Sequence, residues 1–203
     1  MSRIFEWPAE KALPREFLAE LKQLLDDGKI MVYPTSTLYG LGASIYSSDG
    51  IALLNNIKKR PAGMPISVMA NADQIEKLCL VQEIARDFMN SADTRITAIL
   101  PARKDAPAIN ENNDTLAVRF PCDYLTVSII ESVGPITATS ANIHGVPTPV
   151  EIAGTVEQFG NRVSAYIDSG KLAGKPTTLV DYTGESPKII REGVLSAQEA
   201  GDI

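Results

Sequence analysis

The sequence IMVYPTSTLYGLG occupies residues 30–42 and sets the first part of the predicted fold. Its first four residues, 30–33, form an apolar run that ends at Pro34 and predicts a short buried strand that enters a tight loop. Hydroxyl residues follow, and then Gly40 and Gly42, which let a backbone approach a ligand or turn sharply. A plain strand–turn–strand would give the same pattern. The stretch therefore predicts a strand and leaves two interpretations of the glycines open.

The next segment predicts a helix that ends in a cluster of cations. Residues 48–59 carry apolar side chains at helical spacing, with Ser48 or Asp49 placed to cap the start. The proline after Arg60 disfavours helical dihedrals, so the helix should end there. Lys58 and Arg60 can then bind phosphate oxygens, Lys as a point charge and Arg as a planar fork. The alternative is that these cations complement the helix dipole and stay solvated.

Helix and strand patterns alternate along the first part of the chain, and strands dominate later. Helices are predicted at residues 16–27, 72–78, 82–89 and 125–133. Strands are predicted at residues 66–70, 96–100, 116–120, 136–139, 162–167, 178–181 and 188–191. This order predicts an α/β fold with a mixed parallel and antiparallel sheet flanked by helices. We expect residues 1–203 to form a single domain.

The composition argues against several classes of function. The net charge of −6 opposes a broad nucleic-acid-binding face, which needs a basic surface, but a nucleotide pocket needs only a few local cations. Two distant cysteines and one histidine, His144, argue against a zinc site. No apolar run reaches the roughly 18 residues of a membrane helix. We therefore expect a cytoplasmic protein that does not bind membranes.

Polar side chains follow or interrupt several strands at points where a ligand could meet them. Arg119 lies inside the apolar strand at residues 116–120, where a buried charge needs an anionic partner. That partner is either a carboxylate of the chain or an anionic ligand, and the same holds for Arg191. Ser140 and Asn142 can donate to phosphate or carboxylate oxygens. They can equally bond their own backbone in a turn.

Six short motifs follow one another along the chain. They are PTSTLYGLG at residues 34–42, KKRP at 58–61, VRFP at 118–121, TSANIHGVP at 139–147, PTTLVD at 176–181 and REG at 191–193. In this order they resemble the signatures of the YrdC/YciO superfamily, the threonylcarbamoyl-AMP synthases. Each motif alone is weak, whereas six in family order are specific. The resemblance covers about residues 15–194, which we expect to be the core of the domain.

The resemblance implies a twisted, mixed α/β sheet of the YrdC-like (YrdC/RibB) fold with a concave cavity. It also implies that L-threonine, bicarbonate or CO2, and ATP react to give threonylcarbamoyl-AMP and pyrophosphate. The product would serve the tRNA threonylcarbamoyl transferase machinery, which modifies a tRNA adenosine. Whether this chain itself binds RNA is left open.

The resemblance also implies roles for individual residues. The catalytic groups around the nucleotide phosphates would be Lys58, Arg60, Ser140 and Asn142. Further ATP contacts would come from Thr115, Thr148 and Arg191, and L-threonine would contact Thr37, Arg119 and Thr177. No protein metal site is expected, and Mg2+ should arrive bound to the triphosphate, because no carboxylate cluster forms a cage for it.

Several residues depart from the family pattern. Met64, Met69 and His144 stand where relatives carry other residues, and these departures weaken the resemblance of the threonine side more than that of the nucleotide side. An alternative is therefore a YciO-like paralogue that binds nucleotide or double-stranded RNA and has weak or no synthase activity. A third possibility is a regulatory protein that binds an anion without turnover.

Overall fold

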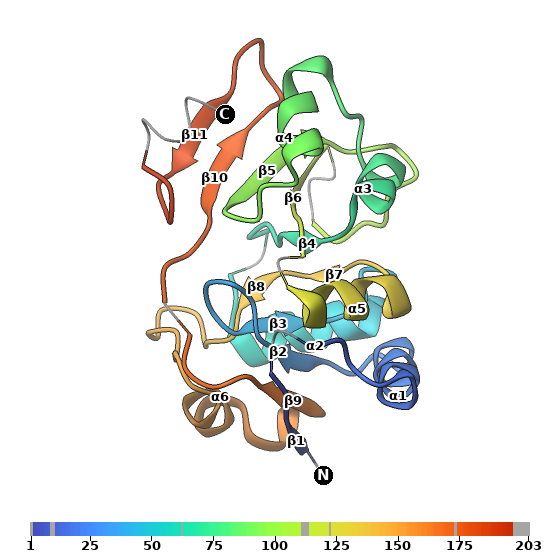
Figure 1. The fold of residues 1–203 in the computed structure, drawn as a ribbon, viewed down its shortest axis with the longest axis vertical. Helices are drawn as coiled ribbons and strands as arrows, with labels where there is room; N and C mark the ends of the chain where they lie inside the picture. The colour runs from blue at the N-terminus through green and yellow to red at the C-terminus, as the bar shows by residue number, and fades with distance from the viewer. Residues whose placement is uncertain are drawn as a thin grey trace.

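The computed structural model describes residues 2–8, 11–61, 63–110, 114–121, 123–172 and 174–196. Within these residues the strands form two sheets, one above the other in Figure 1. The five-stranded sheet has the order β1 (Arg3–Glu6), β9 (Ala165–Asp168), β2 (Met31–Tyr33), β3 (Gly40–Gly42) and β8 (Thr139–Ser140). The six-stranded sheet has the order β11 (Lys188–Arg191), β10 (Thr178–Asp181), β5 (Ile96–Pro101), β6 (Thr115–Arg119), β4 (Val68–Met69) and β7 (Ile136–Thr137). Both sheets mix parallel and antiparallel pairs, which confirms the predicted mixed α/β fold.

The two sheets meet at β7 and β8, which the sequence predicted as one strand. β7 pairs with β4 in the six-stranded sheet, and β8 pairs with β3 in the five-stranded sheet. Ala138 lies between them, and its N–H donates to the carbonyl of Ser67 at 2.7 Å. A bridge between Ser44 and Ile136 adds a second link. The strands expected in one sheet are therefore shared between two sheets that are joined at this point.

Helices cover both faces of the five-stranded sheet (Figure 1). They are α1 (Arg15–Asp26), α2 (Ser48–Lys58), α5 (Tyr124–Val133) and α6 (Ile152–Phe159). Met31 and Tyr33 of β2 pack with α1 and α5, whereas Val32 packs with α2 and α6 on the opposite face. Successive strand residues point to opposite faces, so a strand covered on both sides must be apolar throughout. This explains the continuous apolar run with which the strand begins.

The six-stranded sheet is covered differently at β5 and β6. One face packs against α3 (Ala72–Leu78), η1 (Glu83–Ala85) and α4 (Arg86–Ser91). Ala98, Leu100 and Val118 belong to this apolar cluster. The alternate residues Thr97 and Arg119 point to the other face and line a cavity between the sheets. The two-residue period of these strands therefore turns Thr97 and Arg119 away from the apolar core.

Most of the predicted helices are confirmed to within a few residues. α5 begins at its predicted cap, Asp123, whose carboxylate accepts the N–H of Thr126 at 2.8 Å. The predicted cap of α2 was wrong by one residue, because Ser47 Oγ accepts the N–H of Gly50 at 3.1 Å. β1, α6 and η2 (Gly160–Arg162) were not predicted. α6 was not predicted because its interior Gly154 lowers helix propensity.

Gly40 and Gly42 make room for a tyrosine ring. A Cβ atom at Gly40 would lie 2.8 Å from Tyr33 Cζ, and one at Gly42 would lie 3.0 Å from Tyr33 Cε1. The ring is fixed, since Tyr33 is buried and its hydroxyl donates to the carbonyl of Thr137 at 3.0 Å. The two glycines are therefore strand residues required by packing, and strand–turn–strand was the better of the two interpretations.

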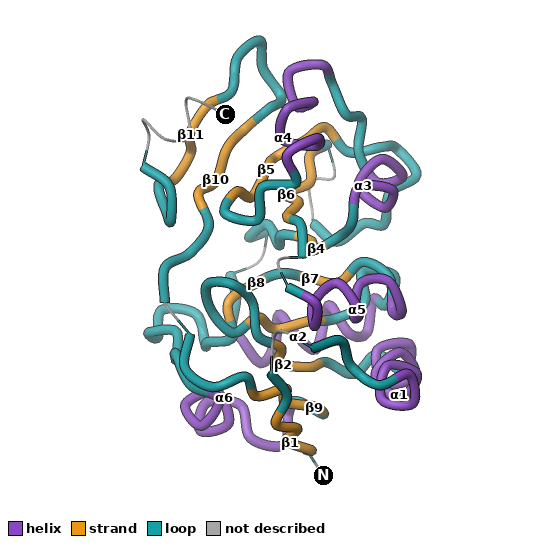
Figure 2. The backbone as a smooth tube through the Cα atoms, in the orientation of Figure 1, coloured by secondary structure: helices purple, strands orange, loops and turns teal. Residues whose placement is uncertain are grey.

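The segment between β9 and β10 climbs along one side of the molecule from the lower sheet to the upper sheet (Figure 2). Its Gly174 N–H donates to the carbonyl of Thr37 at 2.9 Å, which ties the segment to the loop after β2. The connection therefore walls one side of the space between the sheets. In the described residues, no helix is both long enough and apolar enough to cross a bilayer.

The end of this connection is braced by the chain after β11. The N–H groups of Gly193 and Leu195 donate to Thr178 Oγ1 at 3.1 and 3.0 Å. A Cβ atom at Gly193 would lie 2.3 Å from the carbonyl oxygen of Pro176 and 2.5 Å from the carbonyl carbon of Thr177. Glycine is therefore required here by a backbone-to-backbone contact.

We predict that Gly193→Ala lowers the free energy of unfolding by about 2 kcal/mol or more, because backbone atoms must move to admit the methyl group. Gly184→Ala is the matched control, since its nearest neighbour would be 3.9 Å away, and a change within about 0.5 kcal/mol is expected. Urea denaturation measures both variants. Equal effects of the two substitutions would contradict the proposed contact.

Candidate active site

A cavity of about 500 Å3 lies between the two sheets, and both contribute to its wall. Its lining includes every predicted site residue except Thr115, namely Thr37, Lys58, Arg60, Arg119, Ser140, Asn142, Thr148, Thr177 and Arg191. The end of α2, the end of β6, the loop after β8 and the segment before β10 thus meet in one place. Residues that are far apart in the sequence face a common space.

Thr115 lies outside this lining, although it was predicted to contact ATP. It is the first residue of β6, whereas Arg119 is the last. Four strand residues advance about 13 Å, and Thr115 is exposed at the far end of the strand. Thr115 is therefore not part of this lining, and its contact with ATP stays a prediction.

Arg119 is the most strongly buried guanidinium in the cavity lining, with 7% of its surface exposed. Its Nε and Nη2 atoms have no hydrogen-bond partner in the described part of the chain. Burying a cation without a partner is costly, and a site that binds an anion recovers that cost when the anion arrives. Of the two predicted alternatives, an anionic ligand is favoured over a carboxylate of the chain.

Arg60 is held by the loop that follows α2. Its Nη2 donates to the carbonyls of Met64 and Pro65 at 3.2 and 2.7 Å, and its Nη1 donates to Thr139 Oγ1 at 3.3 Å. Burial lowers the pKa of Arg60. Its buried Nε has no partner among the described residues. The guanidinium is therefore oriented in advance and keeps a donor for a ligand.

Lys58 is bonded to the end of β8 and the loop after it through both its side-chain amine and its backbone carbonyl. Its Nζ donates to the carbonyl of Ser140 and, at 2.7 Å, to the carbonyl of Asn142. Its own carbonyl accepts the N–H of His144 at 2.7 Å. Burial, and to a lesser extent the charge of Arg60, lowers the pKa of Lys58 to about 7. Lys58 therefore braces the loop, in addition to adding charge to the cavity.

Ser140 and Asn142 also bond within this loop. Ser140 Oγ donates to Asn142 Oδ1 at 2.5 Å. The Asn142 amide donates to the carbonyls of Ile143 and Val146 at 3.0 and 2.7 Å. Both donor hydrogens of the amide are thus used by the loop, as the turn interpretation predicted. Asn142 shapes the wall of the cavity, and Ser140 offers it the lone pairs of its hydroxyl.

The hydroxyl loop after β2 forms another part of the wall. Thr35 Oγ1 donates to the carbonyl of Leu38 at 2.7 Å and accepts the N–H groups of Thr37 and Leu38, each at 3.2 Å. Its hydrogen-bonding capacity is used locally, so Thr35 fixes the turn. Thr37 Oγ1 lies 3.2 Å from Thr35 Oγ1 and lines the cavity. The predicted ligand contact, Thr37, is thus held in place by its neighbour.

Thr97 is a lining residue that the sequence reasoning missed. Its Oγ1 lies 2.6 Å from Thr177 Oγ1, and both residues are buried. The signal was present, because Thr97 alternates with the apolar residues of β5 as Arg119 does with those of β6. Tyr33 and Ser67 also line the cavity and were not predicted as site residues.

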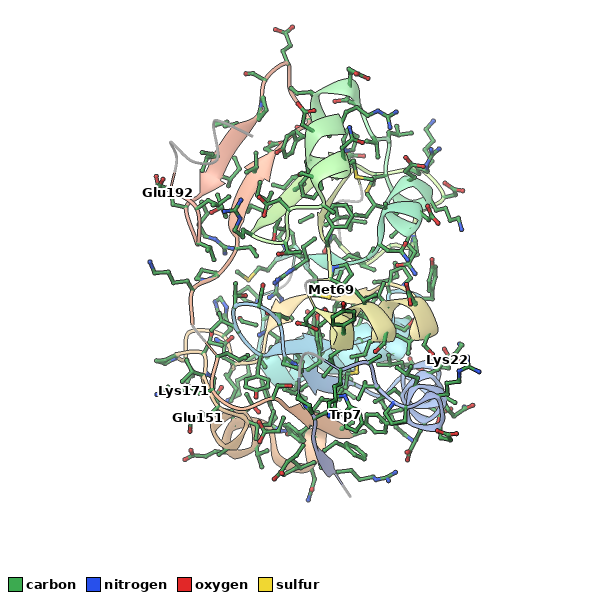
Figure 3. The ribbon with its side chains drawn as sticks, in the orientation of Figure 1. Trp7, Lys22, Met69, Glu151, Lys171 and Glu192 are labelled. Carbon is green, nitrogen blue, oxygen red and sulfur yellow. The ribbon has the colours of Figure 1, made fainter. Side chains whose placement is uncertain are left out.

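The three departures from the family pattern lie in different places. Met69 pairs with Arg119 between β4 and β6, is fully buried, and lies between the two sheets in Figure 3. It belongs to the apolar cluster formed with α1 and α5 and does not line the cavity. Met64 and His144 are exposed and lie in the cavity lining.

A family model matches most of the chain. The model of the Sua5/YciO/YrdC family, described as "Telomere recombination", matches residues 23–193. This range contains every predicted site residue.

Individual relatives give the same picture. The threonylcarbamoyl-AMP synthase of Pyrococcus abyssi is 32% identical over 182 residues, which cover 85% of this chain and 53% of that protein. The crystal structure of P. abyssi Sua5 complexed with L-threonine matches with a TM-score of 0.90 and 28% identity, and covers 99% of this chain and 60% of that one. Escherichia coli YciO shares the fold, with a TM-score of 0.87 and 24% identity over 98% of this chain and 99% of that one. The chain thus spans slightly more than half of the P. abyssi proteins.

Lys58 should make the stability of the fold depend on pH. Its pKa is about 7 in the folded protein and near 10.5 in an exposed lysine. Below pH 7 the folded and unfolded states both carry the charge, so the cost of burying it is present in full. Between pH 7 and about 10 only the unfolded state keeps the proton, and stability rises.

We therefore predict that the free energy of unfolding of the wild type, minus that of Lys58→Met, increases from pH 7 to pH 9.5 by on the order of 2 kcal/mol. Urea denaturation at both pH values measures this difference. The exposed Lys22, which pairs with Asp26, provides the control variant Lys22→Met, for which no such increase is expected. A difference for Lys58→Met that stays constant or falls would show that Lys58 keeps its charge throughout this range.

Proposed function

The chain belongs to the Sua5/YciO/YrdC family, and on this basis we propose that it is a nucleotidyltransferase of the threonylcarbamoyl-AMP synthase type. Its substrates would be L-threonine, bicarbonate or CO2, and ATP, and its products threonylcarbamoyl-AMP and pyrophosphate. The P. abyssi synthase and the L-threonine bound to P. abyssi Sua5 support this assignment. Since the chain spans only part of those proteins, the proposal concerns the chemistry of the cavity.

The observation that carries the proposal is the unpaired guanidinium of Arg119. Two of its nitrogens are buried without a partner in the described residues, and the side chain lines the cavity. A guanidinium can hold the two oxygens of a carboxylate with parallel hydrogen bonds. Arg119 is therefore suited to the carboxylate of an amino acid, and Thr37 and Thr177 line the same space.

The reaction would need two bond-forming steps. The amine of threonine attacks the carbon of CO2 and loses a proton to solvent, which gives a carbamate anion. A carbamate oxygen then attacks the α-phosphorus of ATP, and pyrophosphate leaves with the electron pair of the broken P–O bond. Both reactants in this step are anions, so cations fixed near the phosphates lower its barrier.

The second set of side chains in the cavity suits the triphosphate. Arg60 keeps a buried, unpaired Nε, and Thr148 adds a hydroxyl group. Ser140 would donate its O–H to a phosphate oxygen in place of Asn142 Oδ1. Arg191 is exposed in the cavity lining and donates to the carbonyl of Thr177 at 3.2 Å. Lys58 would act by fixing the loop after β8 and by its charge. The site would therefore work mainly by holding both anions in a reactive arrangement.

Mg2+ is proposed to enter as the complex with ATP. None of the described lining residues is Asp or Glu. Mg2+ prefers carboxylate and phosphate oxygens, so the triphosphate is the better source of ligands here. The product would be handed to the tRNA threonylcarbamoyl transferase machinery.

The YciO-like alternative, a nucleotide- or double-stranded RNA-binding protein with weak or no synthase activity, is not favoured. The P. abyssi synthase is 32% identical to this chain, whereas E. coli YciO is 28% identical over 181 residues. The net charge of −6 also opposes a surface for double-stranded RNA.

The proposal predicts that pyrophosphate release requires ATP, bicarbonate and L-threonine together. Arg60→Ala should lower kcat by about 100-fold or more, because a preset donor to the transition state is lost. Arg119→Gln should mainly raise KM for threonine, by about tenfold or more. A coupled pyrophosphate assay measures both variants.

Arg95→Ala serves as the control, because the half-exposed side chain of Arg95 pairs with Asp93 at 2.7 Å and does not line the cavity. Its kinetics should match those of the wild type. Pyrophosphate release that does not require threonine, or that is unchanged in Arg60→Ala, would contradict the proposed function.

A further inference from the structure

Thr97 stands beside Arg119 on the floor of the cavity. β5 and β6 are antiparallel, with Ala98 opposite Val118 and Ile99 opposite Ala117. One step further along this register, Thr97 is opposite Arg119. Directly opposed side chains share one face of a sheet, with Cβ atoms about 5 Å apart. Both residues line the cavity.

The hydroxyl of Thr97 is paired with that of Thr177. The two Oγ1 atoms lie 2.6 Å apart, and the residues are 4% and 5% exposed. One O–H is used within the pair, which leaves one O–H donor and several lone pairs. A buried hydroxyl that lacks a partner is costly. The pair is therefore a ready site for another hydroxyl group.

The neighbours of Arg119 differ on its two sides. On the β4 side, the register partner is the fully buried Met69, which offers no hydrogen-bonding group to the cavity. On the β5 side lie Thr97 and then Thr177. Arg60 lies on the β4 side, because it contacts Thr139 of β8. The chain runs directly from β7 into β8, and β7 pairs with β4. The hydroxyl pair thus lies on one side of Arg119 and Arg60 on the other, while Arg191 lies beyond the pair and donates to the carbonyl of Thr177 at 3.2 Å.

An α-amino acid that places its carboxylate on Arg119 has three further substituents on its α-carbon. In the proposed function, the amine must face the reacting phosphate, on the side of Arg60. The side chain is attached to the same α-carbon as the carboxylate. With the amine on the side of Arg60, the side chain faces β5. A side-chain hydroxyl there lies within reach of the Thr97–Thr177 pair.

We infer that Thr97 is a specificity-determining residue that recognises the side-chain hydroxyl of the amino-acid substrate. This inference rests on the proposed function and goes beyond it, because it explains why a β-hydroxy amino acid is selected over an apolar one of the same shape. Sites built to hydrogen-bond a hydroxyl discriminate against analogues that lack it, because their own polar groups are left unpaired.

The test compares L-threonine with L-valine, which replaces the hydroxyl by a methyl group. kcat/KM is measured for both amino acids in the pyrophosphate assay with wild type, Thr97→Val and Thr97→Ser. Thr97→Val should lower the threonine-to-valine ratio of kcat/KM by about three- to tenfold, the loss of one neutral hydrogen bond. Thr97→Ser, which keeps the hydroxyl, should preserve the ratio.

Thr155→Val is the matched control. Thr155 is buried, and its hydroxyl donates to the carbonyl of Ile152 at 2.7 Å within α6, away from the cavity lining. Its substitution should leave the ratio unchanged. If Thr97→Val does not fold, as judged by circular dichroism, Thr97→Ala provides the same comparison, because it removes the hydroxyl without placing a methyl group against Thr177 Oγ1.

The outcomes separate the two proposals. A Thr97→Val enzyme that loses activity equally with threonine and valine would overturn the inference and leave the synthase activity intact. A wild type that releases no pyrophosphate with any amino acid would overturn the proposed function and the inference with it.

Discussion

The site depends on the two-residue period of β5 and β6. In each strand, one set of side chains is needed to bury α3 and α4, and the other set must face the opposite side. A slip of one residue in the pairing would exchange the two sets and place Arg119 in the apolar cluster. The cost of such a slip, a charge buried among hydrocarbon side chains, fixes the register. The same constraint that folds the sheet therefore aims the cation into the cavity.

The cavity contains buried cationic groups whose burial is unfavourable until an anionic ligand binds. Arg119 and Arg60 each keep buried, unpaired nitrogens within the described residues, and burial lowers the pKa of Lys58 to about 7. A protein selected for stability alone would pair or remove such groups. The surrounding structure restrains them instead: backbone carbonyls hold Lys58 and Arg60, and Gly193 closes on the chain before β10. Preset cations of this kind are what an attack of one anion on another requires.

Much of the fold and most of the site could be predicted from local signals. The cap at Asp123, the apolar run before Pro34 and the charge inside β6 each act over a few residues, and each was located correctly. The predictions that were wrong or missing concern features that depend on contacts between residues distant in the sequence. Nothing near Ala138 indicates that the strand there changes sheets, and Gly154 hides α6 because local propensity opposes a helix that tertiary packing stabilises.

The roles of individual site residues were harder to predict than their positions. Lys58 and Asn142 lie in the cavity as expected, but their hydrogen bonds go to the backbone of the loop after β8. A sequence motif cannot distinguish a side chain that touches the ligand from one that builds the wall. Thr97 shows the converse case, because its role depends on which residue lies opposite in a neighbouring strand.

The central claim is that the unpaired guanidinium of Arg119 binds the carboxylate of an amino acid. Isothermal titration calorimetry with L-threonine and with L-threonine amide, in the presence of a non-hydrolysable ATP analogue, tests it most directly. The wild type should bind threonine at least about tenfold more tightly than the amide, and Arg119→Met should abolish this difference. Equal affinity of the wild type for both compounds would contradict the account.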